Sequence, residues 1–417
     1  MKVVFSHPTG NQNVRAVLSS LFRTNTLAEF NTTIAINPSN TFIQLLSADI
    51  RNNWMRRTYP VPATFINNYP LLELARLFLP KIGLKKITEH EFGWASIDAV
   101  YKNLDKIVSR RLPDLALKNK ATAVYAYEDG ALATFKKAKQ LGLKCIYDLP
   151  IAYWETGRKL MTEEAERLPH WAETLAGGIL DSKEKLERKT QELQLADVVI
   201  GPGKFVIDSL PAWAKEKEVL MASFGSPEVK ETYIKGEIKK SKVNRPLRVL
   251  FAGSMSQRKG LGDLFAAMKI LNRPDVELVV MGSLISSMKF YKSQYADFTY
   301  EAGRRNEAVL ALMRSCDLLC LPSIVEGRAL VMQEAMSQGL PLIITPNTGG
   351  ADLIIEGQTG FLVPIRTPAA IAEKLEWFAE NRSAIPEMGR NAAQYAKNYT
   401  WENYGATIVE SLADTES

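Results

Sequence analysis

The sequence predicts an α/β protein of two domains, each built on a parallel sheet with helices on both faces. Short apolar runs that resemble buried strands alternate with amphipathic helical patterns through nearly the whole chain, as in βαβ units. The chain has 417 residues, which is more than one typical core accommodates. A polar stretch without a core pattern, residues 235–245, separates the two halves. We therefore expect a first domain at 1–235 and a second at 246–395.

The individual elements follow from the same patterns. Buried strands are predicted in the first half at 3–6, 123–127, 144–148 and 198–200. The second half predicts strands at 247–252, 276–281, 318–321, 342–345 and 361–363, with helices at 263–271, 307–315 and 369–379.

Composition narrows the class of function. The chain is 46% hydrophobic and 24% charged, with a net charge of +6 from 52 basic and 46 acidic residues. This mild excess does not indicate a nucleic-acid-binding protein, and it suits an anionic small ligand or a weak membrane-surface contact. Three cysteines in apolar runs favour buried, reduced thiols. We expect a cytoplasmic protein, because residues 1–6 read as a strand, not as a signal peptide, and no apolar run reaches the roughly 18 residues that span a bilayer.

Residues 51–111 are less regular and interleave basic with aromatic side chains. A helical insertion with its aromatic rings packed inward is the simpler interpretation. The alternative is a surface that contacts a membrane or gathers an acceptor.

The most informative stretch is residues 320–341, CLPSIVEGRALVMQEAMSQGLP. A strand ends at Pro322, Glu326 follows in the loop, and Glu334 lies on the next helix. Ligands of open α/β sheets bind at this edge, where the strands have their carboxyl ends. Carboxylates there can accept hydrogen bonds from sugar or ribose hydroxyls.

A second candidate loop follows the first strand of the second domain. Gly253 ends that strand, and Arg258 and Lys259 precede Gly260. Adjacent cations at a strand end are placed to meet phosphate oxygens, although a plain solvated turn is the simpler interpretation of this motif alone. Gly327 lets backbone approach a ligand closely beside a helix amino end.

Together these motifs resemble the retaining glycosyltransferases of family 4, which have the GT-B fold of two Rossmann-like domains facing a cleft. The resemblance is strongest over residues 249–364. It is carried by Gly253, Arg258-Lys259-Gly260, Pro322-Ser323, the E-x7-E pair Glu326 and Glu334, Gly339-Leu340-Pro341, Gly349-Gly350 and residues 359–364.

The resemblance implies roles for these residues. Arg258 and Lys259 would hold the donor diphosphate, Glu326 the transferred sugar and Glu334 the nucleotide ribose. Other donor contacts would come from Gly253, Ser254, Gly327, Arg328, Ala329, Leu330, Val331 and, near the base, Tyr300. The loop with His7, Gly10, Asn11 and Asn13 would lie on the acceptor side, and a tail at 396–417 would cross back to the first domain.

The chain departs from the family pattern in three places. Ser254 stands where an arginine is common, and residues 328–330 read RAL in place of Gly-Phe-Gly. The first-domain histidine is missing from the strand end that carries Tyr147 and Asp148. Asp148 or Tyr147 would substitute for it in the catalytic set, with His7 as a rival.

The implied reaction moves a sugar from a nucleotide diphosphate to an acceptor hydroxyl with retention, UDP-sugars being favoured over GDP-mannose. The acceptor would be a glycan, a lipid-linked saccharide or a small molecule. No cofactor, metal or nucleic-acid partner is expected, and peripheral contact with the inner face of a membrane is an alternative to a freely cytoplasmic protein. Rival interpretations are a GT-B epimerase, a phosphorylase and a non-catalytic sugar or nucleotide binder. A dinucleotide oxidoreductase is disfavoured because no G-x-G-x-x-G follows the first strand.

Overall fold

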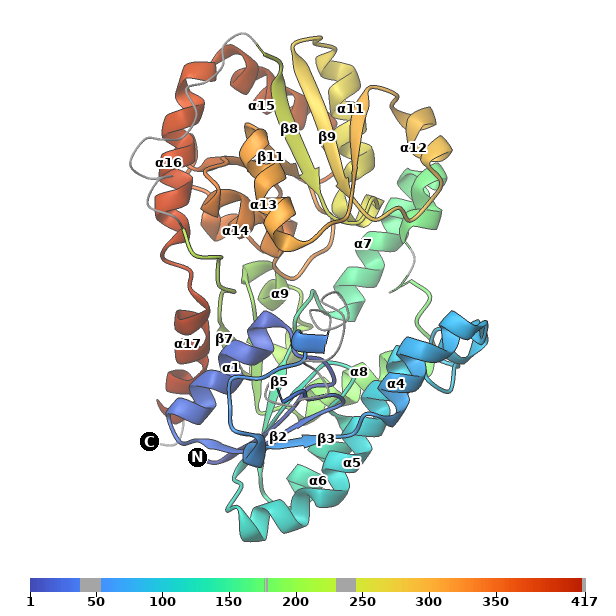
Figure 1. The fold of residues 1–417 in the computed structure, drawn as a ribbon, viewed down its shortest axis with the longest axis vertical. Coiled ribbons are helices and arrows are strands. Elements are labelled where there is room, and N and C mark those ends of the chain that lie inside the picture. Colours follow the sequence, from blue (N-terminus) through green and yellow to red (C-terminus); the bar gives the residue numbers. More distant parts are fainter. Residues whose placement is uncertain (38–53, 176, 178, 230–244, 415–417) are drawn as a thin grey trace.

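The computed structural model describes residues 1–37, 54–175, 177, 179–229 and 245–414 and shows two domains, each with one parallel sheet (Figure 1). The expected fold class is confirmed. The expected linker lies outside the described residues apart from Arg245, as do residues 51–53 of the irregular stretch.

The first sheet has seven strands in the order β3-β2-β1-β4-β5-β6-β7, and the second has six in the order β10-β9-β8-β11-β12-β13. The strands are β1 Val3–Ser6, β2 Leu27–Thr32, β3 Ile66–Asn68, β4 Ala123–Tyr127, β5 Lys144–Asp148, β6 Val198–Gly201, β7 Glu218–Met221, β8 Leu247–Ala252, β9 Val276–Gly282, β10 Phe298–Ala302, β11 Leu318–Leu321, β12 Leu342–Ile344 and β13 Gly360–Leu362.

Helices cover both sheets. They are α1 Gln12–Arg23, α4 Leu71–Phe78, α5 Ile97–Lys118, α6 Leu132–Gln140, α7 Trp154–Arg167, α8 Lys183–Leu195, α9 Lys204–Asp208, α11 Leu261–Leu271, α12 Met288–Gln294, α13 Asn306–Ser315, α14 Leu330–Ser337, α15 Pro368–Glu380, α16 Ile385–Ala396 and α17 Trp401–Asp414. Four short 3-10 helices matter below: η2 Leu79–Ile82, η3 Lys85–Thr88, η4 Pro169–Leu175 and η6 Gln257–Lys259.

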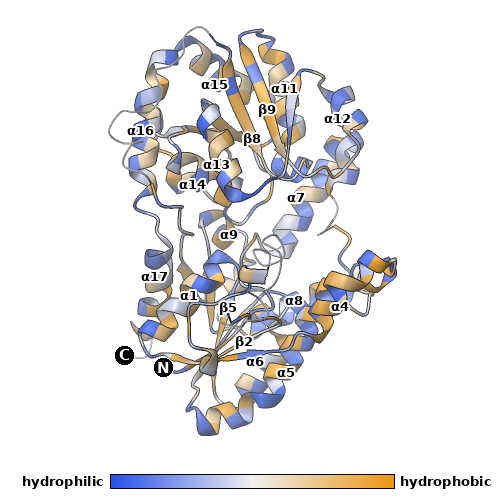
Figure 2. Ribbon diagram, in the orientation of Figure 1, coloured by the Kyte–Doolittle hydropathy of each residue, from blue (hydrophilic) through white to orange (hydrophobic). Residues whose placement is uncertain are grey.

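The central strands are apolar because both faces of each sheet are covered. Along β1, Val3 and Phe5 pack into one core cluster, whereas Val4 packs into the cluster on the opposite face. This alternation is the two-residue period of a strand. Figure 2 shows β8 and β9 of the second domain mostly in the hydrophobic colour, in agreement with their buried apolar residues.

The nine predicted strands are present to within about a residue at each end. Four further strands, β2, β3, β7 and β10, are not among them. β2 has Glu29 and Asn31 at buried positions, and Arg111 bonds both side chains. Polar residues in a buried strand hide its apolar pattern.

The chain crosses between the domains at its end. Helix α17 packs along α1, and Tyr404, Ile408 and Leu412 belong to a first-domain core cluster (Figure 1). Gly405 permits this contact, since a Cβ there would lie 2.6 Å from the carbonyl oxygen of Ala16. The expected tail that returns to the first domain is confirmed.

A second crossing was not predicted. Helix α7 rises from the first domain toward the second, and η4 follows it (Figure 1). Trp171 of η4 is buried in the second-domain core against Phe265 and Tyr291. Glu164 of α7 is fully buried and accepts hydrogen bonds from Arg167, from Gln257 (2.8 Å) and from Arg366. The segment α7–η4 therefore fastens the first domain to the loop that carries Arg258 and Lys259.

No helix among the residues that the structure describes has the length and apolar character to cross a bilayer.

Candidate active site

The structure brings Glu326, Arg258 and Lys259 together at the edge of the second sheet that faces the first domain. Arg258 and Lys259 lie in η6 after β8, and Glu326 lies after the neighbouring strand β11. Both cations contact the same atom, Oε1 of Glu326. It lies 2.9 Å from Arg258 Nη1 and 2.6 Å from Lys259 Nζ, and we call these three residues the Glu326 cluster. Glu326 is only 7% exposed. Two positive charges against one negative charge leave this edge with a net charge of +1, so an anionic group can still be attracted here.

Glycines let these loops approach one another. Gly260 has φ +74°, and a Cβ there would lie 1.9 Å from the carbonyl oxygen of Pro322. Gly253 has φ +150°, with its Cβ position 3.2 Å from Lys259 Cε. Gly260 requires glycine, because its φ is positive and no space remains for a Cβ, whereas at Gly253 the positive φ is the reason that favours glycine. Ser254 follows Gly253, and its Oγ lies 3.4 Å from Ser256 Oγ.

Gly327 serves a contact between the domains that the sequence did not predict. A Cβ at Gly327 would lie 1.7 Å from the carbonyl oxygen of Pro150 in the first domain. The amide of Ala152 donates to the carbonyl oxygen of Glu326 at 3.4 Å. The first-domain wall next to Glu326 is thus the backbone of residues 150–152.

Glu334 lies in the second turn of α14, beside the loop after β10. Its Oε1 accepts a hydrogen bond from Asn306 Nδ2 at 2.9 Å. Burial raises the pKa of Glu334, and the bond from Asn306 opposes that shift. Tyr300 of β10 donates its hydroxyl to the carbonyl oxygen of Gly282 at 3.0 Å. Glu334 and the segment expected near the base therefore share one corner of the domain.

Arg328 turns away from the Glu326 cluster. Its guanidinium is fully buried and bonds Asp352 at 2.7 and 3.0 Å and the carbonyl oxygen of Gly349 at 2.9 Å. Its Nε bonds Gln333 at 2.9 Å, and Tyr399 stacks on it at 5.0 Å. All three guanidinium nitrogens therefore already donate to protein groups, which disfavours a contact between Arg328 and the nucleotide-sugar donor.

The residues after Arg328 differ in what they offer. The amide of Ala329 is already used, since it donates to the carbonyl oxygen of Thr348 at 3.1 Å. Leu330 begins α14 and is 36% exposed, and Val331 is half-buried.

Gln333, one residue before Glu334, reaches the crossover between the domains. Its Nε2 donates to the carbonyl oxygen of Phe224 at 2.5 Å and to Ser226 Oγ at 3.2 Å. The amide of Ser226 in turn donates to the carbonyl oxygen of Tyr399 at 2.8 Å, in the segment that returns to the first domain. Sequence reasoning did not select Gln333, whose only signal is an amide on an otherwise apolar helix face.

The predicted acceptor-side loop lies at the carboxyl end of β1. His7 is buried, its Nδ1 accepts from the amide of Thr9 at 3.0 Å, and burial lowers its pKa to about 4. It is therefore neutral at pH 7. Gly10 is pressed against the Tyr59 ring, Asn11 is exposed and Asn13 is buried.

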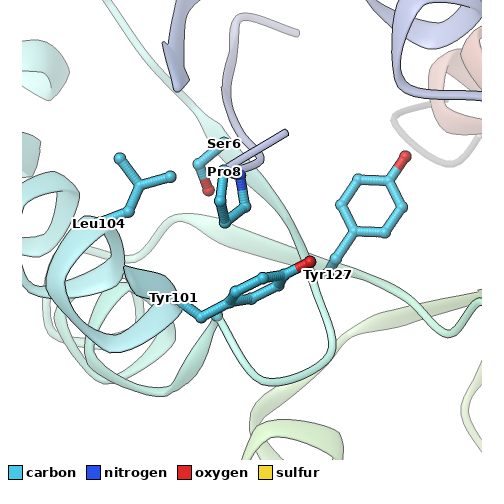
Figure 3. A pocket seen from close by; sticks show the side chains of 6 residues that line it. Ser6, Pro8, Tyr101, Leu104 and Tyr127 are labelled. Atoms are coloured by element: carbon cyan, nitrogen blue, oxygen red, sulfur yellow. The ribbon is translucent and has the colours of Figure 1, made fainter. Parts of the chain in front are cut away.

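A cavity of about 140 Å³ lies beside this loop. Its lining includes Pro8 and Thr9 of the loop, Glu73 and Arg76 of α4, and Tyr101 of α5. A smaller hollow shares Pro8 and Tyr101 with this cavity and is also lined by Ser6, Leu104 and Tyr127 (Figure 3). The cavity beside the predicted acceptor-side loop thus has both ionic and aromatic walls.

The structure does not bring the histidine substitutes to the cleft. Asp148 is 1% exposed, and the Tyr125 hydroxyl donates to its Oδ2 at 2.6 Å. Burial raises the pKa of Asp148 to about 7. Tyr147 is fully buried in the core cluster on the opposite face of the sheet. Neither side chain contacts Glu326 or its cations, so we leave both out of the chemistry proposed below.

One group of potential metal ligands exists in the described part of the chain, formed by His90, Glu91 and Asp181. His90 Nε2 lies 3.0 Å from Asp181 Oδ1 and 3.4 Å from Glu91 Oε1. Lys185 lies 3.1 Å from Asp181. An ammonium group already neutralises the carboxylate, so these residues do not fit a bound cation well.

Comparison with known proteins agrees with this geometry. Residues 235–399 match the model of the family described as glycosyl transferases group 1. The chain is similar to the D-inositol 3-phosphate glycosyltransferase of Paenarthrobacter aurescens (strain TC1), with 29% identity over 57% of this chain and 64% of that protein. The chain therefore spans less than two thirds of this relative.

Two solved structures match nearly end to end. Sucrose-phosphate synthase from Thermosynechococcus elongatus gives a TM-score of 0.62 at 14% identity, covering 100% of this chain and 99% of that one. Anabaena Alr3699/HepE in complex with UDP gives 0.61 at 14% identity, covering 99% and 100%. The solved structures agree with the GT-B fold, and the family model and the curated relative support a glycosyltransferase. The matched residues include Arg258, Lys259 and Glu326, so the cluster that the geometry selects lies within the part of the chain that matches the family model.

Proposed function

We propose that this protein is a retaining glycosyltransferase that moves a sugar from a nucleotide diphosphate sugar, a UDP-sugar in preference to GDP-mannose, to an acceptor hydroxyl. The observation that carries the proposal is the Glu326 cluster, a carboxylate that two cations hold at the ligand-binding edge of a group 1 glycosyltransferase segment. UDP as the donor nucleotide is supported by the UDP complex of the Anabaena structure.

The cluster suits departure of a diphosphate. Arg258 and Lys259 would exchange part of their contact with Glu326 for the phosphate oxygens, where negative charge grows as the glycosidic bond breaks. Preorganised cations stabilise such charge without reorganisation. The carboxylate that they release would accept hydrogen bonds from hydroxyls of the transferred sugar, and Glu334 would bind the ribose.

The first-domain wall supports attack on the same face as the leaving group. A double displacement requires two carboxyl groups about 5 Å apart, one of them acting as nucleophile. The wall nearest Glu326 consists of the backbone of residues 150–152 and offers no carboxylate. A leaving phosphate oxygen would take the acceptor proton instead. The acceptor would enter past His7, where the cavity lined by Tyr101 lies.

The test combines donor binding with two substitutions. Lys259→Ala and Glu326→Gln should each lower kcat/KM by about 10²–10³, which is the usual cost of removing one transition-state contact. The matched controls are Lys269→Ala and Glu387→Gln at exposed positions, which should keep full activity. Calorimetry with UDP and GDP identifies the nucleotide, and NMR of the product identifies its anomer. Full activity in both site variants would overturn the assignment, and an inverted product would overturn the mechanism.

A further inference from the structure

Large apolar side chains are exposed on one short segment of the first domain, residues 71–97, which contains α4, η2 and η3. Phe92 is 82% exposed, Ile82 73% and Trp94 58%. Leu71, Phe78, Leu84 and Ile97 of the same segment are also exposed. Single exposed apolar residues need no explanation, but gathering of this kind marks an interaction surface.

The segment also has unpaired positive charge. Lys81, Lys85 and Lys86 are exposed. Within the described residues, no carboxylate forms an ion pair with these three ammonium groups, and Lys81 lies over the Phe78 ring at 5.3 Å. The surface therefore combines apolar side chains with free cations.

The acidic groups of the segment are mostly directed inward. Glu73 is 1% exposed and is paired with Arg57 and Arg76. Glu91 accepts a hydrogen bond from the amide of Ser182 at 2.8 Å. Glu89 is the remaining exposed carboxylate. The charge that the segment presents outward is thus three lysines against one glutamate.

We propose that residues 71–97 form a docking surface for an anionic lipid bilayer. Apolar side chains that enter the interface, with lysines placed to meet anionic headgroups, are the physical basis of peripheral membrane binding. Tryptophan is enriched at the interface between membrane and water because its ring is amphipathic. Charge complementarity favours this occupant over a second copy of the chain, because two copies would bring their lysines together.

The position of the segment agrees with docking. It projects from the side of the first domain, away from both sheets, at the right of the view (Figure 1). Figure 2 shows α4 with hydrophobic and hydrophilic residues intermixed along it. Ile97 is shared between this surface and the cavity beside the acceptor-side loop. A bilayer on the surface would therefore lie next to the site where the proposed function expects the acceptor, although docking itself does not depend on that reaction.

The experiment is sedimentation of the full chain with vesicles. We expect binding to vesicles of phosphatidylcholine with about 30% phosphatidylglycerol, weaker binding to phosphatidylcholine alone, and release of the protein by salt. The double variant Ile82→Ser/Phe92→Ser and the triple variant Lys81→Glu/Lys85→Glu/Lys86→Glu should each lose about tenfold or more in vesicle affinity.

Matched controls change the same chemistry elsewhere on the surface. Leu117→Ser/Ile270→Ser removes two exposed apolar residues, and Lys215→Glu/Lys269→Glu/Lys397→Glu makes the same change in net charge. Both control variants should bind vesicles as the unmodified chain does. Thermal melts verify that every variant is folded.

Three outcomes would overturn the proposal. The unmodified chain could fail to bind anionic vesicles, or the controls could lose binding as much as the test variants. Alternatively, sedimentation velocity could show that the unmodified chain is a dimer and that Ile82→Ser/Phe92→Ser is a monomer with unchanged vesicle binding. That result would assign the surface to a second copy of the chain. The assay contains neither donor nor acceptor, so its result is independent of the proposed reaction.

Discussion

Substitution of Asp148 tests whether this carboxyl group at the end of β5 contributes to stability or to catalysis. It is 1% exposed, bonds the Tyr125 hydroxyl at 2.6 Å, and has its pKa raised by burial to about 7 from an ordinary 3.8. Hydrogen bonds from phenol groups, including Tyr404 of α17, oppose the shift. The informative change is Asp148→Asn, which keeps the shape and removes the titration.

The magnitude follows from the shift. A carboxyl group whose pKa is higher in the folded state stabilises the fold fully below its unfolded pKa, and this contribution is lost as pH rises through the folded pKa. About three units at 1.36 kcal/mol each give a total loss of about 4 kcal/mol. About 2.5 kcal/mol of this stability is lost between pH 5 and pH 8, and unfolding can be followed at both of these pH values.

The assay is urea unfolding of both proteins at those two pH values. The quantity to compare is the unfolding free energy of Asp148→Asn minus that of the unmodified chain. This difference should be about 2.5 kcal/mol more positive at pH 8 than at pH 5. Other buried acids, such as Glu192, titrate equally in both proteins and cancel. A difference between the two proteins that stays the same at both pH values would refute the reasoning. A hundredfold loss of kcat/KM in folded Asp148→Asn would return this residue to the chemistry.

Two further predictions concern the domain junction and the diphosphate. Glu164→Ala should destabilise the protein by about 3 kcal/mol, because it removes a fully buried carboxylate that accepts hydrogen bonds from Arg167, Gln257 and Arg366. The half-exposed neighbour Glu163 is the control, since Glu163→Ala should cost less than about 1 kcal/mol; equal melting temperatures of the two variants would contradict this. Transfer activity should survive EDTA, because Arg258 and Lys259 can neutralise the diphosphate themselves, and activity restored only by Mg²⁺ or Mn²⁺ would refute that expectation.

Much of the fold could be predicted because buried parallel strands are apolar and regularly spaced. Strands such as β8 and β11 need no knowledge of distant residues. β2 does need it, because Glu29 is tolerated in a buried strand only with Arg111 as its partner, 82 residues away in sequence. The α7–η4 crossing was equally hidden, since nothing local shows that Trp171 packs in the other domain.

The Glu326 cluster could be anticipated for a topological reason. β8 and β11 are neighbours in the sheet, so the loops after their carboxyl ends meet at one edge. The orientation of Arg328 could not be anticipated, because it depends on Asp352 and Tyr399, which the fold brings together. An arginine beside a loop that is predicted to bind phosphate resembles a ligand contact until its protein partners are known.

The pairing of Glu326 with both cations leads to a prediction about UDP binding measured in the absence of sugar transfer. Both cations contact Glu326 Oε1 in the free protein, so under the proposed function the carboxylate would compete with the diphosphate for Arg258 and Lys259. Glu326→Gln removes that competition, so UDP should bind about tenfold more tightly to the variant, a change of about 1.4 kcal/mol. Transfer should nevertheless fall, because the sugar hydroxyls lose their acceptor. Glu334→Gln is the contrasting variant, and calorimetry should show weaker UDP binding there, since the ribose would lose a charged partner. Weaker UDP binding by Glu326→Gln would show that the carboxylate does not compete with the nucleotide, and the exchange of contacts proposed for the diphosphate would then be wrong.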